Sequence, residues 1–366
     1  GRNILQRMHN TLVGYMERNN PLSPLMAHLS AEKIFSTPLL WAVLLVLLLP
    51  TSRAKAQERE QSFTFLNIPT SAQTMAIGGL ALTYVDGMDG QAFDNPALYG
   101  EESAGRLFLS YLNYMSGAHG ANAMYGLPVG ERGAWAVGVR ALNYGKLTSY
   151  NKNNIQGSTF SATDVALQGV FSYELTDKLR GGVALKMLYG NIERYNSFGV
   201  AVDAGVSYYD GENGLSLGAA ITNAGATIKG YSERKTPPAW DLRLGFSQRF
   251  LHTPFRIHAT AYGLNPVILR SSLSTSQKFM TRLVRHFTLG AEYLMDDKLW
   301  IGLGYNPRVA QDLKVQNGNL LSGFSLGVGF NHRAFRLGIA ASHYHPSSLS
   351  LMVTFCTNFG SDQYVF

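Results

Sequence analysis

From Arg106 onward the sequence repeats with a period of two, and this period restricts the fold more than any other feature. Between Phe198 and Tyr208, for example, large apolar residues alternate with glycine, alanine, serine and one aspartate. Such alternation is the sequence signal of β-strands. A soluble sheet would carry charged residues on the face opposite its core. Here that face holds mostly small and polar residues, which is typical of a barrel whose apolar side chains face lipid.

About fourteen segments follow this pattern, and we expect all-β architecture: a transmembrane antiparallel β-barrel over residues 106–366. The connections alternate between tight turns and longer loops, as they do at the two ends of bacterial barrels. Longer loops are predicted near residues 150–160, 190–197, 229–240, 266–285 and 306–319. A soluble β-sandwich or propeller is the alternative. The expected strand centres are Leu109, Met124, Val137, Val170, Leu185, Val202, Leu217, Leu244, Ala259, Leu289, Leu303, Leu326, Ile339 and Val353.

Composition agrees with a barrel and excludes several other classes. Only 15% of the 366 residues are charged, and the mean hydropathy is −0.03, too polar for a helical membrane protein. Beyond residue 56 the chain carries 25 Lys/Arg against 22 Asp/Glu, a net charge of +3. That balance predicts no nucleic-acid partner. Cys356 is the only cysteine, so no disulfide framework is expected.

The N-terminal 56 residues have the features of a targeting segment. Leu39–Leu49 is a continuous apolar run too short to span a bilayer as a helix, and Lys33 precedes it. Ala54-Lys55-Ala56 fits a signal-peptidase site. We therefore expect residues 1–56 to be an upstream extension and a cleaved signal peptide, with Met26 as a plausible start and Gln57 as the mature N-terminus. An uncleaved anchor is the alternative.

Residues 57–105 lack a clear pair of strands. They are too apolar for a solvated tail, and we expect them to form a plug or hatch in the barrel. A disordered leader is the alternative. The apolar residues behind this prediction are Phe63, Phe65, Leu66, Ile68, Leu80, Leu82 and Phe93.

Three short motifs in this segment carry a family resemblance. Phe63–Ala72 reads Phe-Thr-Phe-Leu-Asn-Ile-Pro-Thr-Ser-Ala, residues 76–79 read Ala-Ile-Gly-Gly, and residues 94–98 read Asp-Asn-Pro-Ala-Leu. Together they resemble the start of the PorQ family, outer-membrane components of the type IX secretion system of Bacteroidota. PorV-like and FadL-like barrels are similar more loosely. The plug motif residues are Ser71, Ala72, Gly78, Gly79, Asn95, Pro96 and Ala97.

The resemblance implies a fourteen-stranded, FadL-like barrel of the cell outer membrane. It also implies a place in the attachment complex of type IX secretion, with PorU-like and PorV-like proteins as members. In that family the barrel holds a PorZ-like surface protein, and the peptidase chemistry belongs to PorU. The chain itself is then not an enzyme.

The residues also give no sign of catalysis or of a cofactor. His-Glu-x-x-His and Walker motifs are missing from the sequence, and the two Gly-x-Ser-x-Gly matches, at 214–218 and 323–327, lie in segments with the period of strands and not at a strand-to-helix turn. His343 and His345 share a strand face, but Pro346 follows, and we expect neither metal nor cofactor there. Charged residues do fall on inward positions, where we expect ion pairs with one another or with Asp86, Asp89 or Asp94. These inward residues are Arg140, Lys186, Asp203, Arg243, His258 and Glu292.

Two functions remain open. The first is a non-enzymatic anchor for a surface protein, bound through loops on the cell exterior and surrounded by outer-membrane lipid. The second is a FadL-like transporter of hydrophobic small molecules, which would need a strand kink that the sequence does not reveal. Aromatic residues near strand ends, such as Trp240 and Trp300, are expected at the membrane interfaces. The predicted partner-binding residues are Tyr150, Arg194, Tyr195, Tyr231, Arg234, Lys235, Trp240 and Phe279.

Overall fold

A computed structural model describes most of the chain after residue 60. The described ranges are 61–83, 89–150, 156–232, 235–265, 268, 279–296, 298–312, 322–332, 334–345 and 348–358. The chain separates into two units, Gly1–Lys55 and Ala56–Phe366, and every described residue belongs to the second. The predicted signal peptide, residues 1–56, lies outside the described residues.

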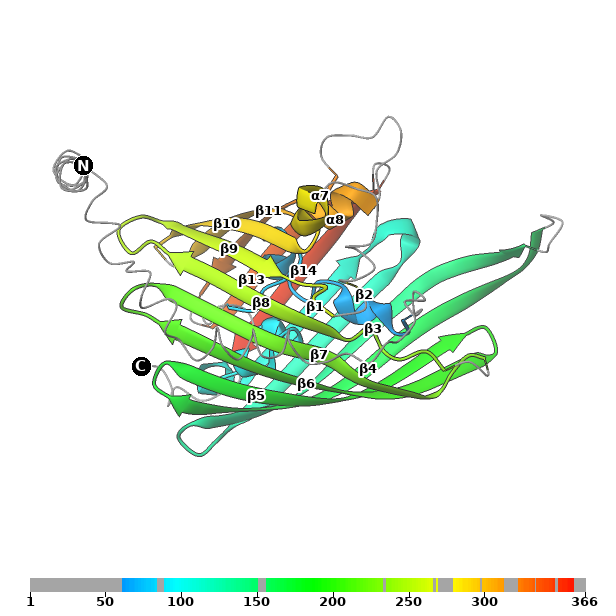
Figure 1. The fold of residues 1–366 in the computed structure, drawn as a ribbon, viewed down its shortest axis with the longest axis horizontal. Helices are drawn as coiled ribbons and strands as arrows, with labels where there is room; N and C mark the ends of the chain where they lie inside the picture. The colour runs from blue at the N-terminus through cyan, green and yellow to red at the C-terminus, as the bar shows by residue number, and fades with distance from the viewer. Residues whose placement is uncertain are drawn as a thin grey trace, which may run out of the picture. The chain divides into compact units, whose positions relative to one another are not determined.

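Fourteen antiparallel strands of the described residues form one closed barrel, in which each strand pairs with its sequence neighbours and β1 pairs with β14 (Figure 1). The predicted fold class is confirmed, and each of the fourteen predicted strand centres lies within a strand. The strands are β1 (Arg106–Asn113), β2 (His119–Val129), β3 (Gly133–Tyr150), β4 (Gln156–Thr176), β5 (Leu179–Ile192), β6 (Tyr195–Asp210), β7 (Leu215–Lys229), β8 (Asp241–Arg249), β9 (Phe255–Ala261), β10 (Phe287–Met295), β11 (Leu299–Tyr305), β12 (Phe324–Asn331), β13 (Phe335–His345) and β14 (Ser348–Asn358).

Burial follows the two-residue period of the sequence. Val202 is 48% exposed on the outer wall, whereas the next residue, Asp203, is fully buried inside. The outer face therefore carries the apolar residues, and the lumen face carries the small and polar ones. Among the described residues, none of the helices combines the length and the apolar character needed to cross a bilayer.

The two ends of the barrel differ in their connections. The turns after β2, β4, β6, β8, β10 and β12 are tight, whereas the chain makes its longest excursions between β7 and β8, β9 and β10, and β11 and β12. The end of the barrel that carries these long connections is called the long-loop end. One predicted loop, residues 190–197, is wrong: β5 and β6 are joined there by Glu193 and Arg194 alone. Glu193 has a φ of 55°, which makes the tight turn possible.

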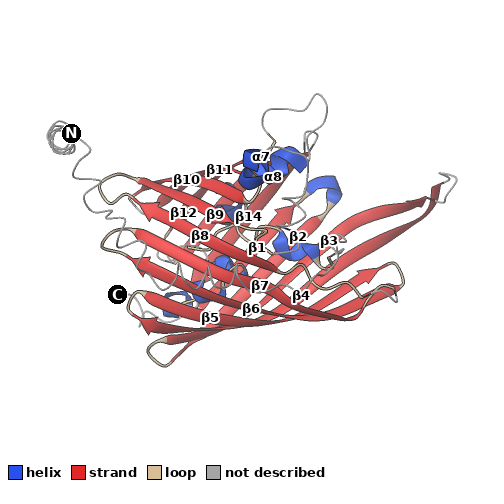
Figure 2. Ribbon diagram, viewed as in Figure 1, coloured by secondary structure: helices blue, strands red, loops and turns tan. Residues whose placement is uncertain are grey.

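The strands are unequal in length. β3 and β4 have 18 and 21 residues, whereas β9 and β11 have 7 each. Figure 2 shows the β3–β4 hairpin running far beyond the other strands. The pairing of β3 with β4 shifts between Asn143 and Lys146, around Gly145 with its φ of 75°. The sequence pattern had given no sign of this bulge.

The segment before β1 fills the lumen with short helices and turns instead of strands. Ser71 caps α5, where its side chain accepts a hydrogen bond of 3.1 Å from the Thr74 amide. Gly78 and Gly79 follow with φ values of 103° and 97°, which end the helix. The elements are η1 (Thr64–Asn67), α5 (Ala72–Ala76), η2 (Asp89–Phe93), η3 (Pro96–Leu98) and η4 (Glu101–Ser103). We call residues 61–83 and 89–105 the plug.

The plug packs against the wall where the lumen face is glycine. A Cβ at Gly304 would lie 2.1 Å from the backbone nitrogen of Gly78. A Cβ at Gly182 would lie 2.4 Å from the backbone nitrogen of Ala97 in the same way. Such contacts leave no room for a side chain. The plug backbone thus packs directly against the lumen-facing glycines of β5, β11 and their neighbouring strands.

Trp300 also belongs to this interface, which corrects its predicted place at the membrane boundary. It is 1% exposed and packs in one cluster with Ala72, Met75 and Ala76 of the plug. Its lumen position follows from the strand period, since Ile301 and Leu303 face outward.

Candidate functional site

A cavity of about 520 Å³ lies at the long-loop end, above the plug. Plug residues such as Phe65, Ile68 and Leu80 line it from below. The wall and the loops contribute a set of aromatic side chains. These are Tyr114, Tyr144, Trp240, Tyr262 and Tyr344. We call this cavity the vestibule.

The vestibule also has a polar side, formed at the starts of β8 and α8 (Pro307–Asp312). The Tyr262 hydroxyl donates to Asn306 Oδ1 over 3.0 Å. The Arg308 guanidinium carbon lies 5.9 Å from the centre of the Tyr262 ring, at the outer limit of a cation–π contact. Asp241 and Arg243 complete this side of the lining.

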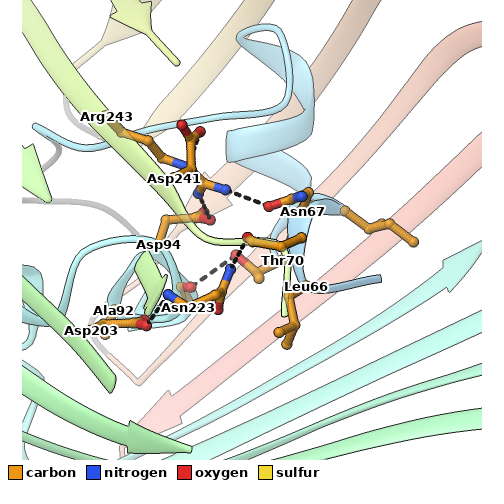
Figure 3. A network of polar contacts seen from close by, with 12 residues as sticks. Leu66, Asn67, Thr70, Ala92, Asp94, Asp203, Asn223, Asp241 and Arg243 are labelled. Atoms are coloured by element: carbon orange, nitrogen blue, oxygen red, sulfur yellow. Dashed lines mark hydrogen bonds and ion pairs between the residues drawn. The ribbon is translucent and has the colours of Figure 1, made fainter. Parts of the chain in front are cut away.

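Arg243 joins the vestibule to the plug, as Figure 3 shows. Its Nη2 donates to Asn67 Oδ1 over 2.6 Å, and its Nη1 lies 3.3 Å from Asp94 Oδ1. Its Nε donates to Asp241 Oδ2 over 3.2 Å. Burial raises the pKa of the Asp94 carboxyl above its usual value, while the charges of Arg243 and Arg140 act in the opposite direction. One guanidinium thereby holds two segments of the plug to β8.

Arg140 makes a second attachment, from β3 to the backbone of the plug. It donates to the carbonyl oxygens of Leu66 and Ile68 over 2.9 and 2.7 Å. Its guanidinium carbon lies 5.5 Å from the centre of the Phe93 ring. Because Arg140 is 3% exposed, these contacts replace the water that its charge would otherwise hold.

The remaining inward charges are paired, as predicted. Lys186 Nζ lies 2.5 Å from Asp203 Oδ2, and both side chains are buried. Glu292 lies 2.7 Å from His258 Nε2 and accepts a hydrogen bond of 2.9 Å from Gln73 of the plug. Asp94, one of the three predicted plug partners, does pair with Arg243. Asp86 lies outside the described residues.

The plug motif residues have structural roles at the same interface. Asn95 Nδ2 donates to the carbonyl oxygen of Leu82 over 3.1 Å, and its Oδ1 accepts from the Ala97 amide over 3.1 Å. The Ala72 amide donates to Thr354 Oγ1 of β14 over 2.8 Å. The motif thus keeps the plug compact and attaches it to the wall.

Five of the eight predicted partner-binding residues have described side chains. Arg194 and Tyr195 lie together at the β5–β6 turn, where the Arg194 guanidinium carbon is 5.3 Å from the centre of the Tyr195 ring. Tyr231 donates to Asp164 over 3.3 Å, and Trp240 lines the vestibule instead of facing a membrane boundary. Lys235 is exposed.

The other three predicted partner-binding residues are Tyr150, Arg234 and Phe279. Tyr150 ends β3 and Phe279 begins α7 (Phe279–Val284), but their side chains are outside the described part, as is the whole of Arg234.

The described residues hold no cluster of His, Cys, Asp and Glu that could bind a metal. The side chain of His345 lies outside this set. Cys356, the sole cysteine of the sequence, is buried on the lumen face of β14.

Sequence analysis did not identify the vestibule or the role of Asn67. The vestibule is assembled from the plug, from β3, β8 and β13, and from the connections after β1, β7, β9 and β11. Such connections carry no period that would predict their meeting. Asn67 stood inside the Phe63–Ala72 motif, and this was the one available signal.

Comparison with known proteins identifies the fold. No family model matches the sequence, and no curated protein is significantly similar to it. Among solved structures, the toluene transporter TodX of Pseudomonas putida is 14% identical, with a TM-score of 0.52 over 80% of this chain and 98% of TodX. A deltaS2 mutant of TodX, described as a monoaromatic hydrocarbon channel, gives a TM-score of 0.54 at 14% identity over 79% of this chain and 99% of its own.

A FadL homologue of Pseudomonas aeruginosa is 11% identical over 80% of this chain and 98% of its own, with a TM-score of 0.44. The chain therefore has the closed, fourteen-stranded barrel fold of the TodX structures, and at this identity the likeness concerns the fold alone.

Proposed function

We propose that the chain is an outer-membrane channel that admits small hydrophobic molecules through the vestibule. One observation carries this proposal: a cavity of about 520 Å³ with six aromatic side chains lies directly above the plug. Mostly apolar cavities with a few placed polar groups are typical of small-molecule sites. Long loops lie on the cell exterior in bacterial barrels, which would make the vestibule the entry side.

The TodX fold supports the same function, since that barrel is a toluene transporter. The present chain would use its barrel in a similar way, with the plug as the barrier between the vestibule and the short-turn end. The plug fits closely against the wall, so passage requires it to shift. The hydrogen bonds of Arg243 to the plug can be replaced by hydrogen bonds to water, whereas the close packing of the plug near Gly304 cannot. We therefore place the movement of the plug on the Arg243 side.

Ligand binding to the purified barrel tests this function. Toluene added to the detergent-solubilised protein should change the fluorescence of Trp240, which lines the vestibule. Trp240→Phe should remove most of that change, while Trp135→Phe, on the lipid-facing wall, should keep it. If toluene and other small aromatic compounds leave the fluorescence of the native protein unchanged, the vestibule is not a site for them.

A second candidate function is the anchoring of a surface protein, as the PorQ-like plug motifs imply. One structural observation favours it: the β3–β4 hairpin extends beyond its neighbours, and Arg194 and Tyr195 lie beside its base. In this function the partners are a PorZ-like surface protein and the PorU-like and PorV-like members of the attachment complex. Deletion of this chain should then release a surface protein into the medium. Retention of all surface proteins would contradict the anchoring function.

A further inference from the structure

The β3–β4 hairpin leaves the barrel wall as a two-stranded ribbon. β2 pairs with β3 only as far as Asn143, and β5 pairs with β4 only as far as Ala162. β3 and β4 continue to pair with each other up to Tyr150 and Gln156. At about 3.3 Å per residue, the ribbon extends roughly 20 Å past its neighbours. Figure 1 shows it as the longest projection of the described barrel.

Each edge of this ribbon is covered at its base. A Cβ on Gly145 would lie 2.8 Å from the carbonyl oxygen of Gly117, so the β1–β2 connection covers the β3 edge there, and in the described part of the chain β2 does not pair with β3 beyond Asn143. The β4 edge is covered only at Ser161, whose carbonyl accepts a hydrogen bond of 3.1 Å from the Glu193 amide. In the described part of the chain, no strand pairs with the outer edge of β4 from Gln156 to Phe160.

The backbone of Thr159 points toward this open edge. Ser161 directs its carbonyl away from β3, toward Glu193, whereas Ser158 directs its carbonyl to the Ser149 hydroxyl of β3 over 2.9 Å. Backbone groups alternate in direction along a strand. Thr159 therefore presents its N–H and C=O on the side of Ser161, where the open edge lies.

We infer that an extended segment of another surface protein adds to the β4 edge at Gln156–Phe160 and pairs with the backbone of Thr159. This inference rests on the second candidate function, the anchoring of a surface protein. A two-stranded ribbon is marginally stable in water, and a third strand stabilises it. Arg194 and the half-exposed Tyr195 lie at the base of the same edge, and such residues are typical anchors of interfaces.

The chemistry of the ribbon favours a strand over other occupants. Apart from the exposed Leu147, its described side chains are mostly polar, among them Thr148, Ser149, Gln156, Ser158 and Thr159, and these are too polar for lipid contact. They are also too small to form deep pockets. Main-chain hydrogen bonds remain as the source of affinity, and these suit an extended segment of a partner.

Photo-crosslinking in intact cells tests the inference on the full chain. A benzophenone amino acid placed at Gln156, which is exposed, should give one product that maps to a single segment of another protein. Thr159→Pro removes the edge N–H and should reduce this product roughly two- to tenfold, as the loss of a backbone hydrogen bond implies. Thr159→Ala keeps the N–H and should leave the product unchanged.

Three outcomes would overturn the inference: no product, a product with a second copy of this chain, or a product that Thr159→Pro leaves intact. Because Thr159 lies beyond the wall, both variants should keep the heat-dependent gel mobility of a folded barrel. If a surface protein still co-purifies with the Thr159→Pro barrel, the anchoring function stands and the ribbon is not its site. If nothing co-purifies with the native barrel, both fail.

Discussion

The plug meets the rest of the molecule in two different ways. Around α5 its backbone lies against lumen glycines so closely that no side chain fits between them. Around Asn67 and Asp94 it is held by hydrogen bonds and ion pairs to Arg243, beside a cavity of about 520 Å³. The first interface is set by shape and the second by exchangeable polar contacts. A plug built in this way can loosen at one end while the other stays in place.

The buried charges of the lumen should give the largest effect. Lys186→Met would leave the Asp203 carboxylate buried without its cation and should lower the free energy of unfolding by about 3–5 kcal/mol. Urea titration of the barrel in lipid vesicles would measure this loss. Lys178→Met, which breaks the ion pair with Asp210 at the short-turn end, should leave the free energy of unfolding nearly unchanged, because solvent screens that pair.

A double variant sharpens this result. Lys186→Met combined with Asp203→Leu removes both charges and should recover most of the lost stability. If the double variant is as unstable as Lys186→Met alone, packing and not the unpaired charge is the cause.

The glycine interface should give the next effect. Gly304→Ala would place a methyl group 2.1 Å from the Gly78 nitrogen, and backbone cannot move aside as a flexible side chain would. We expect a loss of about 1–3 kcal/mol in unfolding free energy. Gly169→Ala is the matched control, since a Cβ there meets nothing within 4 Å. Equal stability of the two variants would mean that the plug does not pack against β11 as described.

The two interfaces also show which parts of the structure can be predicted from the sequence. The period of two placed Arg243, Lys186 and Glu292 in the lumen, and the same period would have placed Trp300 there. The position of Trp300 near a strand end instead predicted a place at the membrane boundary, and this prediction was wrong. Burial against α5 outweighed the general preference of tryptophan for interfaces.

The turn at Glu193 and Arg194 shows a second limit. Asn191, Asn196 and Ser197 have the composition of a loop, yet they pair as the ends of β5 and β6. Pairing between strands compensated for their weak strand preference. The vestibule depends on how loops from distant parts of the chain meet, and the sequence carries no local signal for such contacts.

The polar interface should respond to a smaller change. Asn67→Ala removes the 2.6 Å hydrogen bond from Arg243 and should cost about 1.5 kcal/mol, as for a bond to a charged group. The plug should then open more often, which single-channel recording in planar bilayers would detect as added conductance. Asn143→Ala, which removes an exposed hydrogen bond to Thr163, should leave the conductance unchanged. A closed Asn67→Ala barrel would argue that the plug is held at the glycine interface alone.

The smallest effect is expected in the vestibule itself, where single side chains contribute modestly to the binding of a small ligand. Trp240→Leu keeps an apolar side chain but removes an aromatic ring from the lining. If small aromatic molecules stack there, their affinity should fall by about 0.5–1.5 kcal/mol, the range for one aromatic pair. Calorimetric titration with toluene would measure the change. Trp135→Leu, on the outer wall, should leave the affinity as it is, because that ring faces lipid. Equal losses of affinity in both variants would place the toluene in the detergent or lipid around the barrel and not in the vestibule. The vestibule would then not be the entry site.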